Sequence, residues 1–302
     1  MAVQVETVSQ RDAELEELEI GLLLEAVYQR YGYDFRQYAR ASVARRLRQH
    51  VINSGAGTIA GLIPQVLHDE AAFQALARDL SITVTEMFRD PSFYVALRQH
   101  VVPFLRTFSF VNIWHAGCAT GEEVYSLAIV LTEENLYGRA RIYATDFNEA
   151  ALQKARERIY PLDKIQQYTA NYQQAGGTHS FADYYHARYD AVILDPALAA
   201  NVTFANHNLV TDGVFAEMHL ILCRNVLIYF DRTLQGHVLA LLRNSLRRRG
   251  FLCLGSKESL EFSPVKNDFS QVVPQEPIYQ EKGWKVADAN RMVANGDGSW
   301  TR

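Results

Sequence analysis

The sequence has few of the features that mark a specialised class of protein. Its three cysteines, Cys118, Cys223 and Cys253, lie far apart and have no metal-site spacing. Each lies in or before an apolar run, so we expect buried free thiols, as in a reducing compartment. The acidic N-terminus is unlike a secretory signal, and no apolar run approaches the roughly 18 residues that span a membrane. We therefore expect a cytoplasmic protein.

The chain also carries little net charge. Its 302 residues have a formal net charge of −4, which gives no overall attraction to nucleic acid. Hydrophobic residues make up 48% and charged residues 21%, as in a globular protein with an apolar core. The length allows one large domain or two of ordinary size. We expect no nucleic-acid partner, no metal, no membrane insertion and a monomer.

The first 80 residues predict a helical unit. Residues 1–19 are polar, and we expect them to be disordered. Between residues 20 and 80, apolar side chains recur at helical spacing, as at Leu23 and Val27 and at Leu47 and Val51. Glycines at 55 and 57 break the pattern. These observations predict an all-helical domain over residues 20–80.

Arginines are concentrated in one part of this helical unit. They could form an ordinary solvated face, or a docking surface for an acidic partner. The net acidity of the chain makes such a local basic cluster more noticeable. The cluster consists of Arg36, Arg40, Arg45, Arg46 and Arg48.

From about residue 108 the pattern changes to alternating strands and helices. Strands are expected at 111–114, 141–145, 218–223 and 251–255. Helices are expected at 122–136, from after Asn148 to Ile159, and at 234–246, the last ending in a basic turn and Gly250. This alternation predicts a parallel sheet with helices on both faces, in an α/β domain over residues 108–284.

Three further segments complete the expected organisation. Residues 81–107 would form a linker and a helix that contributes to the active site. Residues 172–206 interrupt the alternation, because a glycine-rich stretch precedes three short strand-like runs, at 184–186, 191–194 and 202–205. We expect a small antiparallel insert there. The polar tail over residues 285–302 is expected to be disordered.

The stretch from Val111 to Glu123 is the most informative part of the sequence. It reads as a strand, a turn of small residues and the start of a helix. Such a turn lets the backbone approach a ligand closely. Glu122 and Glu123 follow at once; they would repel a pyrophosphate and attract an ammonium or sulfonium group. This favours S-adenosylmethionine over a dinucleotide, although a plain turn with a glycine bend remains the alternative.

Polar residues also follow other strands. Asp146 follows the second strand, where an acid can bind both hydroxyls of a ribose; the alternative is a helix N-cap. Asn225 follows a later strand and could instead form a local turn. Before the sheet, Thr83, Thr85 and Arg89 could share one side of the link between the domains. Arg89 suits a carboxylate ligand, or else a salt bridge with its neighbour Asp90.

Four motifs then carry a resemblance to a known family. In chain order they are VTEMFRDPSF, ATGEEVYSLA, ATDFN and CRNVLIYFD. The chain resembles the CheR-type chemotaxis-receptor glutamate O-methyltransferases over about residues 20–282. The resemblance implies a Rossmann-like, S-adenosylmethionine-dependent methyltransferase domain with an N-terminal all-helical domain and a small antiparallel β-subdomain. It also implies methyl transfer to glutamates on the cytoplasmic helices of chemoreceptors.

The resemblance also implies roles for individual residues. Arg89 and Tyr229 would lie closest to the reacting groups. Glu123 would hold the ammonium end of the cofactor, and Asp146 its ribose. The receptor would dock through the basic cluster and the β-subdomain. The implied cofactor-binding set is Thr83, Thr85, Arg89, Glu123, Asp146, Asn208, Leu209, Cys223, Arg224 and Asn225.

The expected chemistry agrees with this assignment. A glutamate side chain, with an unperturbed pKa of about 4.3, is already an ionised nucleophile at neutral pH, so no general base is needed. Arg89 and Tyr229 would position it. Two other interpretations remain open: a methyltransferase for small molecules or nucleic acid on the same sheet, and a protein that binds S-adenosylmethionine without catalysis.

Overall fold

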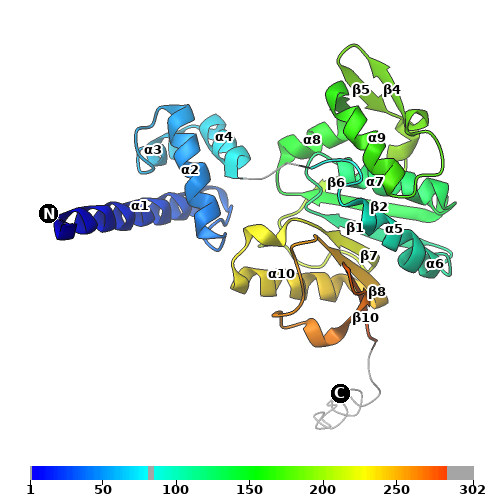
Figure 1. The fold of residues 1–302 in the computed structure, drawn as a ribbon. Helices are drawn as coiled ribbons and strands as arrows, with labels where there is room; N and C mark the ends of the chain where they lie inside the picture. The colour runs from blue at the N-terminus through cyan, green and yellow to red at the C-terminus, as the bar shows by residue number, and fades with distance from the viewer. Residues whose placement is uncertain (1, 81–84, 284–302) are drawn as a thin grey trace, which may run out of the picture.

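A computed structural model of the chain describes residues 2–80 and 85–283 (Figure 1). Thr83 lies outside the described residues. The tail over residues 285–302, which the sequence predicts to be disordered, also lies outside them. Within the described ranges, no helix has the length and apolar character that a membrane span requires.

The N-terminal domain is helical, as the sequence predicts. Its core is built from apolar residues on facing helices, among them Ile20, Leu24, Leu47 and Phe73, each at most 2% exposed. Gly55 ends the second helix in a left-handed conformation (φ 69°), where the sequence predicts a break. Over residues 2–80 the helices are α1 (Ala2–Tyr31), α2 (Arg40–Ser54), α3 (Leu62–His68) and α4 (Glu70–Leu80).

The predicted disorder of residues 1–19 is wrong, because α1 begins at Ala2. The polar residues that indicated disorder include five glutamates, which are good helix formers. Two of them are also held by the next helix: Glu16 pairs with Arg48, and Glu17 with Arg40 at 2.7 Å. Helix α1 is therefore one continuous element that crosses the predicted boundary.

The main sheet is mostly parallel, as predicted. In the described chain it has seven strands in the order β6-β2-β1-β7-β8-β10-β9. The first five run parallel, and an antiparallel hairpin closes the far edge. The strands are β1 (Val111–Ala116), β2 (Ala140–Asp146), β6 (Val202–Asn206), β7 (Met218–Cys223), β8 (Leu246–Leu254), β9 (Phe269–Val273) and β10 (Glu276–Glu281).

Helices cover both faces of this sheet (Figure 1). Successive residues of a strand point to opposite faces, so Ile113 packs on the α7 side and Trp114 on the α10 side. All three cysteines are buried free thiols, as expected. The α-helices of this part are α5 (Pro91–Ala96), α6 (Val102–Leu105), α7 (Glu122–Glu133), α8 (Glu149–Glu157), α9 (Ile165–Gln174) and α10 (Arg232–Ser245), with a π-helical turn, η1 (Leu97–Val101), between α5 and α6.

Short 3₁₀ turns connect many of these elements. The turn η6 follows the short loop after β7. These turns are η2 (Tyr137–Arg139), η3 (Leu162–Lys164), η4 (Phe181–Tyr184), η5 (Pro196–Ala199), η6 (Leu227–Tyr229) and η7 (Lys266–Asp268).

The small antiparallel sheet is present, but its composition differs from the prediction. It consists of β3 (Ile159–Pro161), β5 (Ala191–Leu194) and β4 (Tyr185–Arg188), in that order. The third predicted strand, at 202–205, instead forms β6, which pairs in parallel with β2 at the edge of the main sheet. Residue 159, predicted to be helical, starts β3, because Arg158 ends α8 in a left-handed conformation (φ 60°). Local patterning shows that a segment is a strand but does not identify its partner.

A second correction concerns the end of α10. The sequence predicts a helix that stops at Gly250, but α10 ends at Ser245 and β8 begins at Leu246. The basic turn therefore belongs to the strand. The pairing of β8 with β7 shifts register between Met218 and Leu220, and Arg249 takes a positive φ of 61° there. This irregularity accommodates the basic residues that the sequence assigned to a helix end.

The helical domain contacts the sheet domain beside the end of β7. The backbone N–H of Ala39 donates to the carbonyl of Tyr229 at 2.8 Å, and the N–H of Asp231 donates to the carbonyl of Gln37 at 2.9 Å. Next to these bonds, the ring of Phe35 lies 5.9 Å from that of Phe147. Two backbone bonds and an aromatic contact thus place the helical domain against η6.

Candidate cofactor site

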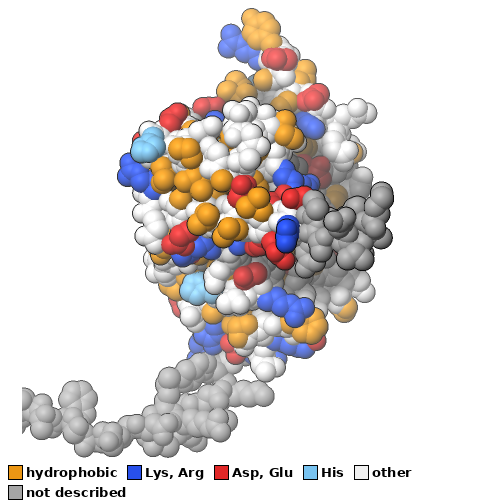
Figure 2. Space-filling model, turned by 90° about the vertical axis from the view of Figure 1, so that its left-hand side faces the viewer, with side chains coloured by type: hydrophobic (Ala, Val, Ile, Leu, Met, Phe, Trp, Pro, Cys, Tyr) orange, Lys and Arg blue, Asp and Glu red, His pale blue; other side chains and the backbone are white. Residues whose placement is uncertain are grey.

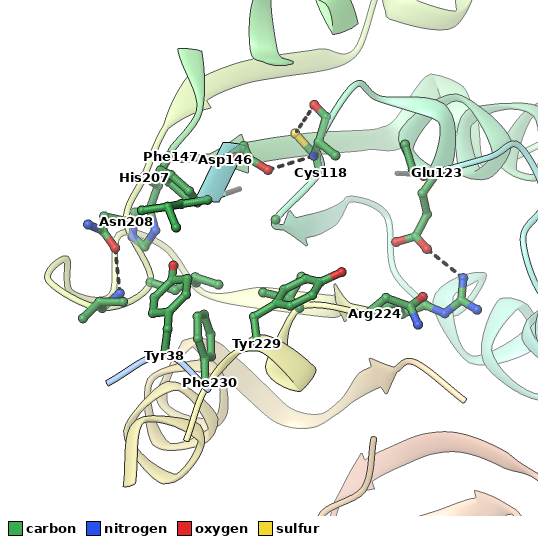
Figure 3. Close-up of a pocket in the computed structure, with 18 of the residues that line it drawn as sticks. Tyr38, Cys118, Glu123, Asp146, Phe147, His207, Asn208, Arg224, Tyr229 and Phe230 are labelled. Atoms are coloured by element: carbon green, nitrogen blue, oxygen red, sulfur yellow. Dashed lines mark hydrogen bonds and ion pairs between the residues drawn. The ribbon is translucent and has the colours of Figure 1, made fainter. Parts of the chain in front are cut away.

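The main cavity of the described chain lies at the carboxyl ends of β1, β2 and β7. Its empty space is about 930 Å³, including the part open to solvent. One end carries charged side chains, Glu123 and Arg224, and the other end carries Phe147, His207 and Asn208 (Figure 3). This is the edge of a parallel sheet where ligands bind in such folds.

The turn after β1 forms one wall of the cavity through its backbone. The N–H groups of Gly117 and Cys118 both donate to the carbonyl of Thr145, at 2.8 and 2.9 Å. Gly117 has a φ of 81°, and a Cβ there would lie 2.6 Å from the side chain of Val226. Glycine is therefore required at this position, because the turn and the loop after β7 approach so closely.

A buried guanidinium organises the charged end. Arg224 has a side chain 1% exposed, and it pairs with Glu123 at 2.7 Å and with Asp90 at 2.8 Å. It also donates to the carbonyl of Arg89 and lies 4.0 Å from the centre of the Phe93 ring. Arg224 thus ties the segment before α5 to the start of α7, and it binds one oxygen of the Asp90 carboxylate.

Glu123 keeps its negative charge in this buried position. Burial by itself would raise the pKa of Glu123, but its interactions with Arg224 and His115 outweigh burial and lower the pKa. The Nδ1 atom of His115 lies 3.4 Å from Oε1 of Glu123, on the side away from Arg224. A charged Glu123 carboxylate at the cavity wall fits a ligand with an ammonium group.

Glu122 behaves differently from its neighbour. It does not line the cavity, and it accepts a hydrogen bond from the hydroxyl of Thr120 at 2.6 Å. Burial raises the pKa of Glu122 to about 7. The sequence argument counted two carboxylates facing the ligand; the structure places one of them, Glu123, at the cavity.

Asp146 lines the cavity at the end of β2. Its two carboxylate oxygens accept N–H bonds from Ala119 and Asn148, each at 2.9 Å. Burial raises the pKa of Asp146, and these N–H donors oppose the shift. The N-cap position of α8 itself belongs to Asn148, whose side chain accepts from Ala151. The cap that the sequence considered for Asp146 is therefore supplied two residues later.

Most of the sequence-predicted residues meet in this cavity. Two do not: Thr83 lies outside the described residues, and Cys223 is a fully buried residue at the end of β7 that does not line the cavity. The predicted residues that line it are Thr85, Arg89, Glu123, Asp146, Asn208, Leu209, Arg224, Asn225 and Tyr229.

Other lining residues were not found by the sequence argument. Phe147 and Phe230 are immediate neighbours of predicted residues and lie within the quoted motifs, which was the available signal. Tyr38 and Leu80 come from the helical domain, and His207 follows β6. No local pattern could connect Tyr38 and Leu80 to the site, because tertiary contacts alone bring them there, whereas His207 directly precedes the predicted Asn208.

A second buried carboxylate holds the loop after β7. Glu258, 8% exposed, accepts N–H bonds from Gly255 at 2.6 Å, Asn225 at 2.9 Å and Ile228 at 3.2 Å. Burial raises the pKa of Glu258, while these N–H donors lower it. Asn225 takes a positive φ of 61°, an uncommon conformation that Glu258 helps to maintain. The loop carries both Asn225 and Tyr229 into the cavity.

Comparison with known families agrees with this geometry. The family model described as "CheR methyltransferase, SAM binding domain" matches residues 83–276, and the CheR all-alpha domain matches residues 18–81. The chain belongs to the CheR methyltransferase family.

Individual relatives cover most of the chain. The Cher3 protein of Pseudomonas putida is 48% identical over 265 residues, which are 88% of this chain and 97% of that protein. The chemotaxis protein methyltransferase of Salmonella typhimurium is 29% identical over 82% of this chain and 85% of its own length. The N-methyltransferase NodS of Bradyrhizobium japonicum, solved with S-adenosyl-l-homocysteine, aligns over 60% of this chain and 71% of its own at 16% identity, with a TM-score of 0.32, too low to support an argument.

The cofactor of this CheR-family domain is S-adenosylmethionine, and the cavity suits it. The charged end carries the Glu123 carboxylate and the guanidinium groups of Arg89 and Arg224, which could hold an ammonium and a carboxylate. The other end has apolar and aromatic walls that could hold a flat ring. Among the described residues, no group of three or more His, Cys, Asp or Glu side chains could hold a metal ion.

We predict that Glu122→Gln stabilises this CheR-family protein at alkaline pH. The folded-state pKa of about 7 lies above the unfolded value of 4.5, so the stability lost through Glu122 grows as the pH rises between these values, is complete above pH 7 and is small at pH 4.5. In urea unfolding, the free energy of unfolding of the variant should exceed that of wild type by about 2 kcal/mol at pH 8 and by little at pH 4.5. The exposed Glu157→Gln is the matched control; an equal gain at both pH values would contradict the prediction.

We predict that Glu258→Gln weakens cofactor binding. The amide replaces one acceptor oxygen with a donor that faces backbone N–H groups, so the loop with Asn225 should relax. Calorimetry should show a Kd for S-adenosylmethionine that is higher by about tenfold or more. Urea unfolding should show a free energy of unfolding that is lower by about 1–3 kcal/mol. Glu261→Gln, an exposed glutamate that follows Glu258 in the segment after β8, should leave the Kd and the free energy of unfolding unchanged. Wild-type affinity in Glu258→Gln would refute the role of this carboxylate.

Proposed function

We propose that this chain transfers a methyl group from S-adenosylmethionine to the γ-carboxylate of glutamates on the cytoplasmic helices of chemoreceptors, giving a glutamate methyl ester. The observation that carries the proposal is that Arg89 and Tyr229 line the same cavity as the cofactor residues Glu123 and Asp146. The names of the Salmonella typhimurium and Escherichia coli relatives, chemotaxis protein methyltransferase, support the same pathway. Such a substrate places the reaction in the cytoplasm.

The chemistry requires positioning rather than proton removal. A glutamate carboxylate is ionised at neutral pH, since its unperturbed pKa is about 4.3. When bound, S-adenosylmethionine supplies a methyl group on a positively charged sulfur. Attack by an anion on a cation neutralises charge, so a cavity that excludes water favours it. The residues of the chain must therefore hold the carboxylate in line without binding it too tightly.

Tyr229 and Arg89 are suited to that positioning. Burial raises the pKa of Tyr229, so its hydroxyl stays protonated and can donate to the substrate carboxylate. Figure 3 shows Tyr229 between the charged and apolar ends of the cavity. We assign Arg89 to holding the carboxylate and Tyr229 to orienting it, Glu123 to the cofactor ammonium, and Asp146 to the ribose. Asn208 and Leu209 would flank the adenine.

The proposed docking surface for the receptor needs revision. Three arginines of the basic cluster are paired with acidic side chains: Arg36 with Asp34 and Glu25, Arg40 with Glu17, and Arg48 with Glu16. On the face in Figure 2, Lys and Arg side chains are interspersed with Asp and Glu. The basic cluster is therefore partly neutralised within the molecule.

Arg46 has a different environment from the rest of the cluster. Its guanidinium lies 5.3 Å from the centre of the Tyr229 ring, and it donates to the carbonyl of Leu80, another cavity residue. Arg46 thus extends from α2 toward the active site. We propose that it meets the substrate directly beside Tyr229, while Arg45 and the β-subdomain contribute the outer contacts.

The first test of the function uses receptor cytoplasmic fragments that carry Glu or Gln at the candidate positions. We expect label from methyl-labelled S-adenosylmethionine on the Glu forms alone, released by mild base as an ester should be. Equal labelling of Gln forms, or none on any fragment, would refute the carboxylate mechanism. Binding of the cofactor without any transfer would instead support a non-catalytic role.

The second test is Arg89→Ala. If Arg89 holds the substrate carboxylate, transfer should be lost while the Kd for S-adenosylmethionine stays within about tenfold, ~1.4 kcal/mol. Single-turnover transfer and calorimetry measure the two quantities separately. Arg106→Ala, which removes an exposed arginine that does not line the cavity, is the control and should keep wild-type turnover. Unchanged turnover in Arg89→Ala would remove Arg89 from the mechanism.

A further inference from the structure

The turn η6 separates two clefts of the molecule. Tyr229 lines the cofactor cavity, whereas its neighbour Ile228 lines a second cleft, of about 660 Å³ including space open to solvent. Phe262, at the rim of the second cleft, is 89% exposed, and Ile228 is 38% exposed. Two exposed apolar side chains beside one cleft form a surface that a binding partner could bury favourably.

The exposed charges of this second cleft are positive. Arg232 and Lys257 are both exposed at its lining, and within the described chain neither forms an ion pair. The carboxylate of Glu258 at the cleft is bound by three backbone N–H groups, and Glu261 close by pairs with Lys266. Two of the four arginines of α2, Arg40 and Arg48, are by contrast paired with glutamates of α1. The second cleft therefore holds unneutralised positive charge in a chain of net charge −4.

The cations and the apolar groups form one surface. The guanidinium of Arg232 lies 6.0 Å from the centre of the exposed Phe262 ring. Ile228 joins this surface to the active site, because it stands next to Tyr229 in the same turn. We name Ile228, Arg232, Lys257 and Phe262 the Phe262 surface.

We propose that the Phe262 surface docks an acidic segment of the protein substrate, with an apolar side chain of that segment seated against Phe262 and Ile228. The inference rests on the proposed function, which requires a substrate rich in glutamate. Complementary charge selects the acidic partner, and continuity with Tyr229 selects the substrate over an unrelated protein. A segment bound here would lie across η6, with a neighbouring glutamate directed to the cofactor cavity.

The test compares wild type with Phe262→Ala and with the double variant Arg232→Glu/Lys257→Glu. The probe is a set of chemoreceptor cytoplasmic fragments, used in methyl transfer and in fluorescence anisotropy binding. We expect KM and Kd for the fragment to rise about tenfold or more, with kcat within about twofold and unchanged affinity for S-adenosylmethionine. Wild-type KM should also rise more steeply with salt than that of the double variant.

The matched control is another exposed aromatic and arginine pair. Phe110 is 45% exposed, and Arg141 lies 5.2 Å from its ring, beside the amino end of β1 and thus at the edge opposite the cavity. Phe110→Ala and Arg141→Glu should leave KM for the fragment unchanged. Thermal unfolding checks that all variants are folded.

The outcomes separate this inference from the proposed function. Methyl transfer with wild-type KM in both Phe262-surface variants overturns the inference and leaves the function standing. Variant-sensitive binding without transfer supports the surface and refutes the function. If wild type neither binds nor methylates a fragment, both fail. Binding to phosphatidylglycerol vesicles that the variants lose, with unchanged KM for the fragment, would assign the surface to a membrane and overturn the inference.

Discussion

The buried guanidinium of Arg224 is the interaction on which the site depends. A charge buried this deeply is tolerated only when it is paired, and removing one partner of such a pair costs on the order of 3–5 kcal/mol. Its partners are Glu123 at the start of α7 and Asp90 before α5, with the carbonyl of Arg89 between them. These three segments must meet for Arg224 to be buried. The same contact therefore orders the cofactor end of the cavity and the segment that carries Arg89.

Glu258 performs the corresponding task on the other side of the β7 loop. Arg224 anchors the loop through its side chain, and Glu258 anchors it through the N–H groups of Asn225 and Ile228. A loop with a positive φ at Asn225 would relax without such support. Held from both sides, it presents Asn225 and Tyr229 to one cavity and Ile228 to the next. One short loop thus connects cofactor binding, substrate positioning and the Phe262 surface.

The helical domain takes part in the site as well. The N–H of Ala39 binds the carbonyl of Tyr229, Arg46 lies over the ring of that tyrosine, and Tyr38 lines the cavity. These contacts make the helical domain part of the active site, and not only a separate docking module. Acidic residues, mostly of α1, pair with Arg36, Arg40 and Arg48. These ion pairs weaken the attraction of the three arginines for an acidic substrate.

The sequence by itself determined the alternation of strands and helices, the order of the domains and the motif-bearing part of the cavity. Small residues at Gly117 and polar residues after strands, such as Asp146 and Asn225, are local features, and local features can be read from spacing. Tertiary structure alone decided the rest. It turned Glu122 away from the ligand, assigned Val202–Asn206 to the main sheet, extended α1 to Ala2 and brought Tyr38 to the cavity. The physical reason is that strand partners, ion-pair partners and burial depend on segments far apart in the chain, which no local pattern records.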